Sequence, residues 1–182
     1  MKTVSDDILI EKSRTGNSMA FGVLVERYSN YCYSIVCRIV GNRAEAEDVV
    51  QDAFVLAWQE IDGFDCKKGK FTTWLYTIAT RLAIDILRKR RSQEDLIAVK
   101  EDDSNENDAL KNLFNEELEE QIKWACKSLT ALQKAVFVLR EIEEMDVHEV
   151  SEITGLSAKQ IKDNLYVARK KVREQLQKVI RV

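Results

Sequence analysis

The sequence predicts an all-α protein made of two small helical domains joined by an acidic flexible linker. None of its 182 residues is Pro and only six are Gly, so little in the chain would interrupt a helix. Apolar residues recur at helical spacing between residues that commonly start and stop helices. A polar, acidic stretch divides the chain, and we expect domains at residues 1–91 and 108–182 with the linker at 92–107.

Four helices are expected in the first domain, and a residue that can cap the first turn precedes the first, third and fourth of them. Ser5 precedes the first, Gly41 stops the second, and Asn42 with Glu45 fits a capping box for the third. Thr72 or Thr73 is the expected cap of the fourth. The expected helices end near Arg14, Val40, Ile61 and Arg91.

The second domain is expected to contain helices over residues 108–129, 131–144, 147–154 and 158–180. Three pairs of residues have capping-box spacing: Thr130 with Gln133, Asp146 with Glu149, and Ser157 with Gln160. Gly155-Leu156-Ser157 predicts a tight turn before the last helix. Two helices joined by such a turn, the second of them basic, form the pattern of a helix-turn-helix domain.

Charge is segregated along the chain although the whole carries only −3. Residues 41–66 hold seven acids against one Arg, and residues 67–91 hold eight bases against one acid. Residues 92–120 are strongly acidic again, and residues 121–182 are basic. Such blocks are often only solvated helix faces, but they are also typical of chains with polyanionic partners.

Several classes of protein are disfavoured by what the sequence lacks. It contains no apolar run of the about 20 residues that a membrane span needs, and its start has no signal-peptide core. Four scattered Cys and one His indicate neither a disulfide framework nor a metal site, and no catalytic motif is present. We expect a cytoplasmic protein that needs no cofactor or metal and is not an enzyme. Cys66 is the thiol expected to be exposed.

Aromatic and basic residues are interleaved between the third and fourth helices. Phe71, Trp74 and Tyr76 directly follow three lysines at 67, 68 and 70. Stacking rings beside ammonium groups suit unpaired nucleic-acid bases. The alternative, that Phe71 and Trp74 are core residues at the start of a helix, is equally compatible with the pattern.

These segments resemble a known family. The stretch AEAEDVVQDAFVLAW (44–58), followed by FTTWLYTIATRLAIDILRKRR (71–91), closely resembles the first domain of bacterial extracytoplasmic-function (ECF) sigma factors, which belong to the sigma-70 family. The stretches LTALQKAVFVLR and GLSAKQIKDNLYVARKKVREQL are similar to the second domain. Order and spacing match over about residues 18–91 and 120–177.

The resemblance implies a non-enzymatic factor that binds core RNA polymerase and directs it to promoters. In that family the acidic third helix docks on the polymerase, and acids suit a basic protein partner. The polymerase contacts expected here are Glu47, Asp48, Gln51 and Asp52. A solvated helix face is the alternative explanation of these residues.

The following loop and helix of the family open the −10 promoter element and hold an extruded base. Extrusion costs a few kcal/mol of stacking, which a pocket with cationic walls can offset. The candidates here are Phe64, Lys68, Lys70, Phe71 and Trp74 in the loop region, with Arg81, Arg88, Arg90 and Arg91 on phosphates. Arg81 stands where family members commonly have Asn, and Asp85 is expected to pair with Arg81 or Arg88.

The last helix of the family enters the major groove of the −35 element. The residues expected nearest to DNA are Lys159, Gln160, Lys162, Asn164 and Tyr166, with Arg169 and Lys170 on phosphates. Thr130, Ser151, Asp163, Asn164 and Val167 differ from the residues usual at their positions. These differences bear on the promoter sequence that is read.

Two other functions fit parts of the sequence. A helix-turn-helix regulator that binds duplex DNA by itself would need neither the acidic helix nor the aromatic and basic loop. A small nuclease or metal-dependent helical enzyme would need a cluster of carboxylates and His, which the sequence does not contain. The sigma-factor hypothesis also implies an anti-sigma factor as partner, besides core polymerase and promoter DNA.

Overall fold

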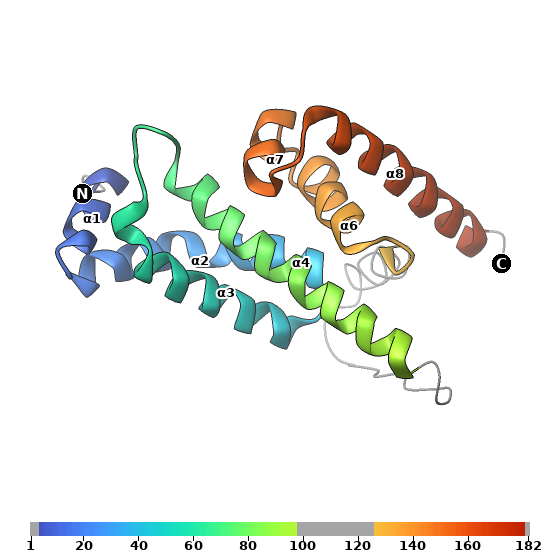
Figure 1. Cartoon of the computed structure of the whole chain (residues 1–182), viewed down its shortest axis with the longest axis horizontal. Coiled ribbons are helices and arrows are strands. Elements are labelled where there is room, and N and C mark those ends of the chain that lie inside the picture. Colours follow the sequence, from blue (N-terminus) through green and yellow to red (C-terminus); the bar gives the residue numbers. More distant parts are fainter. Residues whose placement is uncertain (1–3, 98–125, 181–182) are drawn as a thin grey trace.

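The computed structural model describes residues 4–97 and 126–180, and it confirms an all-α fold with two helical domains (Figure 1). Residues 98–107 of the predicted linker and residues 108–125 of the helix predicted at 108–129 lie outside these ranges. The α-helices within the described ranges are α1 (Asp6–Arg14), α2 (Ser18–Val40), α3 (Arg43–Gln59), α4 (Phe71–Ile97), α6 (Ala131–Phe137), α7 (Val147–Thr154) and α8 (Ala158–Ile180). A 3₁₀ turn, η1 (Ile61–Gly63), follows α3, and a π-helical turn, η2 (Val138–Ile142), follows α6.

Most of the predicted helix ends are confirmed, together with the hydrogen bonds that cap them. Gly41 and Gly155 end α2 and α7 in the left-handed region, at φ 80° and 72°, where a Cβ would be strained. Both members of the capping boxes at Thr130 and Asp146 are formed. Asn42 accepts from the Glu45 amide at 3.0 Å, whereas Glu45 itself pairs with Arg90 instead of returning a bond to the cap.

Three predicted boundaries are wrong. Helix α4 begins at Phe71, before either Thr, because the Phe71 ring is buried in the core and the Trp74 amide already bonds to the Lys70 carbonyl. The same helix continues to Ile97, past the predicted end at residue 91. The helix predicted for residues 131–144 instead changes to the π turn η2, which ends before Glu144 at φ 54°.

The first domain packs α1 to α4 around a core of side chains such as Leu24, Ile35, Val49 and Leu75, each almost fully buried. In the second domain Ile161, Leu165, Ala168 and Val172 of α8 are buried, as their spacing predicts. Apolar burial of this kind is the main term that stabilises both domains.

The two domains are packed against each other. Helices α6 and α7 contact α4, and η2 contacts α2, so one continuous hydrophobic core runs through both domains. Arg38 on α2 pairs with Glu143 at 2.5 Å, and the Glu143 side chain is only 4% exposed. Across the described residues, no helix is both long and apolar enough to cross a membrane.

Candidate nucleic-acid interface

A cavity of about 560 Å³ lies beside the segment 64–70, which we call the pocket loop. Aromatic rings from three elements pack at its base. The centroid of the Phe64 ring is 5.0 Å from that of Trp74 and 5.9 Å from that of Phe71, while Tyr28 of α2 lies 5.8 Å from Phe71. Phe64 and Phe71 are buried. Both rings nevertheless line the cavity together with the half-buried Tyr28. The half-buried Trp74 packs against Phe64 and Phe71 and is not among the lining residues.

The rim of the cavity is basic on one side and acidic on the other. Lys67, Lys68 and Lys70 are exposed on the pocket loop. Asp65 shapes this loop, because its carboxylate accepts from the Lys67 amide at 2.9 Å and its carbonyl from the Lys68 amide at 2.9 Å. Asp6 and Asp7 of α1 line the opposite side. The site can thus hold a flat, polar group between a cationic loop and acceptor oxygens.

The arginines of α4 have different surroundings. Arg81, Arg88 and Arg91 are exposed, and Arg88 pairs with Asp85 at 3.5 Å, as the sequence predicts. Arg90 is turned back to the first domain, where it pairs with Glu45 and donates to the Val40 carbonyl at 3.4 Å. Arg90 is therefore engaged in joining α4 to α3.

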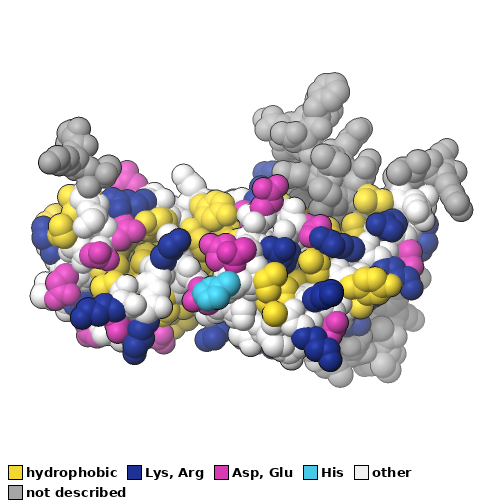
Figure 2. Space-filling view, turned by 90° about the horizontal axis from the view of Figure 1, so that it is seen from above, with side chains coloured by type: hydrophobic (Ala, Val, Ile, Leu, Met, Phe, Trp, Pro, Cys, Tyr) yellow, Lys and Arg dark blue, Asp and Glu magenta, His cyan; other side chains and the backbone are white. Residues whose placement is uncertain are grey.

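Helix α8 presents a basic surface beyond the helix-turn-helix turn. The turn is fixed by the Ser151 hydroxyl, which donates to the Leu156 carbonyl at 2.7 Å. Figure 2 shows this face of the molecule, and basic side chains predominate among the charged ones over the half that α8 occupies. Of the residues of α8 that were predicted to contact DNA, the following are exposed: Lys159, Gln160, Lys162, Tyr166, Arg169 and Lys170.

Two residues of α8 are held by neighbours. The Asn164 amide donates to the Gln160 carbonyl at 2.8 Å, and Arg169 pairs with Glu141 at 2.6 Å. Tyr166 is the most exposed aromatic residue of the structure as described, at 71%. An exposed Tyr among bases is suited to contact a nucleic-acid groove.

The acidic residues predicted to contact polymerase lie on one helix. Glu47, Asp48, Gln51 and Asp52 are all exposed on α3. Sequence reasoning missed an apolar groove of about 620 Å³ between α2 and α3, lined by Phe21, Tyr33, Phe54 and Trp58 and bordered by Glu47 and Gln51. The sequence signal for it was the presence of Phe21 and Tyr33 on α2 and of Phe54 and Trp58 on α3.

The four cysteines are free thiols. Within the described ranges no three His, Cys, Asp or Glu side chains are grouped to hold a metal ion. Cys32 and Cys126 are buried, and burial raises the pKa of the Cys32 thiol to about 12. Cys66 is exposed on the pocket loop, as predicted.

Comparison with known proteins decides the family. Residues 24–93 match Sigma-70 region 2 and residues 121–172 match the region 4 family. The ECF RNA polymerase sigma factor SigW of Bacillus subtilis strain 168 is 33% identical over 180 residues, which cover 92% of this chain and 94% of SigW. The chain belongs to the ECF group of RNA polymerase sigma factors.

Other relatives agree with this assignment. The ECF sigma-E factor of Escherichia coli K12 is 29% identical over 188 residues, covering 98% of this sigma factor and 97% of that one. CnrH, solved in complex with the cytosolic domain of CnrY, superposes with a TM-score of 0.69 at 27% identity and covers 94% of this chain and 97% of its own. The sigma factor RpoE of Bartonella quintana, solved with the anti-sigma factor NepR, shares the fold, with a TM-score of 0.65 at 23% identity and coverage of 86% and 96%.

The structure of this sigma factor groups the predicted site residues into three surfaces. They are the pocket loop with α4, the exposed face of α3 beside the apolar groove, and the exposed side of α8. Phe64 and Phe71 are buried although they line the cavity, and Arg90 faces inward. Asp6, Asp7 and Tyr28 also line the cavity. This could not be predicted from the sequence, because the positions of these residues depend on how α1 and α2 pack.

Proposed function

We propose that this ECF sigma factor acts in the cytoplasm by bringing core RNA polymerase to promoters and opening their −10 element with the pocket-loop cavity. The observation that carries the proposal is the combination of an aromatic base with a lysine rim in one cavity. Lys68 and Lys70 would neutralise phosphates, and the rings of Tyr28, Phe64 and Phe71 that line the cavity would contact an extruded base. Trp74, which packs on both Phe rings, would hold them in place. This activity requires no catalytic side chain and no cofactor.

The phosphates beside the opened strand would meet the exposed arginines of α4. Arg81, Arg88 and Arg91 are free of the inward contacts that hold Arg90. Arg81 brings a charge where the family commonly has Asn, so we expect it to contribute to affinity through phosphate and not through base reading. Arg90 is not included among these phosphate contacts, because its pairing with Glu45 gives it a role in stabilising the fold.

Recognition of the −35 element is assigned to α8. Lys159, Gln160 and Lys162 lie at the N-terminal end of this helix, which in helix-turn-helix proteins is the end that contacts base edges. Asn164 and Tyr166 would follow one turn later, while Arg169 and Lys170 would contact phosphates. The bond from Asn164 to the Gln160 carbonyl must be exchanged if its amide is to read a base.

Polymerase binding is assigned to α3 and its groove. Asp48 and Asp52 are one helical turn apart and exposed, so they present a pair of charges to a basic partner. The groove with Phe54 and Trp58 would take apolar side chains of the same partner. We further propose that an anti-sigma factor regulates the protein, by analogy with RpoE, which was solved with one.

A reconstituted transcription assay with core polymerase and a promoter tests these roles. The double variant Lys68→Gln/Lys70→Gln should retain most duplex binding but lower the permanganate reactivity of unpaired thymines about tenfold. The double variant Lys159→Gln/Lys162→Gln should instead weaken recruitment. The slope of the logarithm of its binding constant against the logarithm of the salt concentration should decrease in magnitude by about two, because two phosphate contacts are lost. Template with a pre-melted −10 region should rescue the first variant and leave the second impaired.

Lys12→Gln on α1 and Lys178→Gln near the end of α8 are matched controls, because both lysines are exposed outside these surfaces. Equal loss of binding and opening in both double variants would contradict the division of labour. Tight, sequence-specific duplex binding without polymerase would favour a stand-alone regulator instead.

A further inference from the structure

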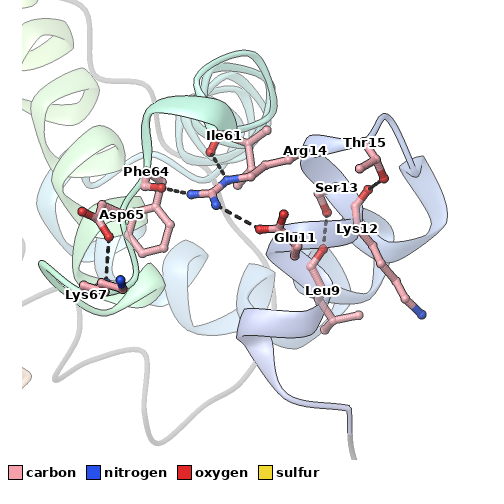
Figure 3. Close-up of polar contacts among 10 residues, drawn as sticks. All are labelled: Leu9, Glu11, Lys12, Ser13, Arg14, Thr15, Ile61, Phe64, Asp65 and Lys67. Atoms are coloured by element: carbon pink, nitrogen blue, oxygen red, sulfur yellow. Dashed lines mark hydrogen bonds and ion pairs between the residues drawn. The ribbon is translucent and has the colours of Figure 1, made fainter.

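The guanidinium of Arg14, at the end of α1, holds the start of the pocket loop. Its Nη2 donates to the Phe64 carbonyl and its Nε to the Ile61 carbonyl at 3.4 Å, while Nη1 pairs with Glu11 at 3.1 Å. Figure 3 shows the side chain reaching from α1 to both carbonyls. A single residue thus ties the first helix to a segment about 50 positions away in the sequence.

The two carbonyls lie where the backbone leaves regular structure. Ile61 begins the turn η1, and Phe64 is the first residue after it. Helix and turn ends leave carbonyls that need outside donors, and a guanidinium offers several donors in a fixed plane. Arg14 therefore fixes the direction in which the chain enters the loop. The next contacts, from Asp65 to the Lys67 and Lys68 amides, continue from this fixed point.

The other end of α1 contacts the same cavity. Asp6 accepts from the hydroxyl of Tyr28 and pairs with Arg27, and the Tyr28 ring packs on Phe71 at the base of the cavity. Ile10 also lines the cavity between these two ends. Helix α1 consequently lines the cavity with Asp6, Asp7 and Ile10, and through Arg14 it also holds the first residue of the pocket loop.

We propose that α1 is part of the strand-opening site and that Arg14 is a positioning residue for the pocket loop, an inference that rests on the proposed function. An extruded base must offset its lost stacking with contacts that form after the duplex separates. If the loop carrying Lys68 and Lys70 were free, part of that gain would be consumed in ordering it. Arg14 keeps the loop ordered before DNA arrives, so its effect falls on opening and not on recruitment.

The first measurement is the mobility of a spin label on Cys66, the exposed thiol of the loop. Cys37→Ser provides the background, because Cys32 and Cys126 are buried. The label should become clearly more mobile with Arg14→Ala and partly so with Arg14→Lys, which keeps the charge but loses the planar donor set. Glu11→Gln, which removes the ion pair and leaves both carbonyl contacts, is the control and should not change the spectrum.

The second measurement uses unlabelled protein with core polymerase. Arg14→Ala should lower promoter opening about tenfold while recruitment to duplex DNA stays within about twofold, and pre-melted template should restore transcription. Arg14→Lys should recover part of the opening. Glu11→Gln should behave as the wild type.

The inference would be overturned by an unchanged label in Arg14→Ala, or by opening equal to that of the wild type when the label has become mobile. Parallel losses of recruitment, opening and thermal stability would likewise reduce Arg14 to a structural role. Failure of the proposed function is distinguishable, because then the wild type itself would not open promoters, whereas the label would still report whether Arg14 holds the loop.

Discussion

At the scale of residues, neighbours of the same type have different tasks because their surroundings differ. Arg90 and Arg91 are adjacent in the sequence, yet Arg90 is half-buried against Glu45 and Arg91 is exposed. A guanidinium that is both half-buried and paired within the protein has less to offer a phosphate than an exposed one. Burial and pairing together thus distinguish Arg90, which is engaged within the protein, from Arg91, which is accessible to a ligand.

This division predicts opposite effects for two alanine variants. Arg90→Ala should lower the free energy of unfolding by at most about 1 kcal/mol, since its partly exposed ion pair is screened by solvent. Its effect on DNA affinity should be small. Arg91→Ala should leave stability unchanged and weaken promoter binding. Urea unfolding and a filter-binding assay check the pair, and a reversed pattern would show that the inward contact of Arg90 is not its main role.

The acidic face of α3 supplies a second prediction. Asp48→Lys/Asp52→Lys should weaken binding to core polymerase at least about tenfold, because each change replaces a favourable charge contact with a repulsive one. Glu26→Lys/Glu60→Lys alters two exposed acids outside the groove and serves as the control. Affinity is measured by competition for polymerase with a labelled wild-type protein. A folded double variant of normal affinity would rule out this face.

At the scale of elements, the short helices of the second domain depend on their ends. Asp146 starts α7 and accepts from the Glu149 amide at 2.8 Å, and bonds from the Glu149 and His148 amides lower the pKa of its carboxyl below the usual value. A lowered pKa stabilises the folded state above the ordinary pKa of Asp, and the contribution is lost as the pH falls through the lowered value. The cap of the helix-turn-helix unit is therefore acid-sensitive.

Asp146→Asn should remove that sensitivity while keeping an acceptor at the cap. Near neutral pH the variant should be slightly less stable than the wild type, because a neutral amide interacts less with the helix N-terminus. The difference should shrink as the pH is lowered toward 3. Thermal midpoints across this range provide the test, and a constant difference would mean that the charge of Asp146 is not what stabilises α7.

The junction between η2 and α7 contains a strained residue. Glu144 has φ 54°, which is unfavourable for a residue with a Cβ. Glu144→Gly should therefore stabilise the protein by about 0.5 to 1 kcal/mol, the relief of strain exceeding the added freedom of the unfolded chain. Glu144→Val should destabilise it. The midpoints of urea unfolding measure both changes, and a destabilised Gly variant would disprove this account of the turn.

At the scale of the whole molecule, the two domains are closed on each other. Glu143 of the second domain is almost fully buried against Arg38 of the first, and it lies beside the Tyr31 hydroxyl, where partial burial and then this carboxylate raise the pKa of Tyr31 to about 12. The −10 and −35 elements are separated by about 25 base pairs, which is about 85 Å of straight B-DNA. If the two domains read these two elements as proposed, we expect promoter binding to separate them.

Arg38→Glu should therefore favour the open form, since it leaves Glu143 buried beside a like charge. The compactness of the free protein, measured by small-angle X-ray scattering, should decrease. The charge-exchanged variant Arg38→Glu/Glu143→Arg should regain much of the compact form. Equal radii of gyration for all three proteins would show that this pair does not hold the domains together.

The helices, the turn before α8, the family and most of the exposed charged side chains could be predicted from the sequence. These features depend on local spacing and capping, and Asn42, Gly155 and the apolar series from Ile161 express them directly. That Phe71 is both a core residue and part of the cavity lining, that Arg90 turns inward, and that Arg14 reaches the pocket loop follows from the tertiary structure alone. Such contacts join residues about 50 positions apart, and their existence depends on how whole helices pack, which no local pattern encodes.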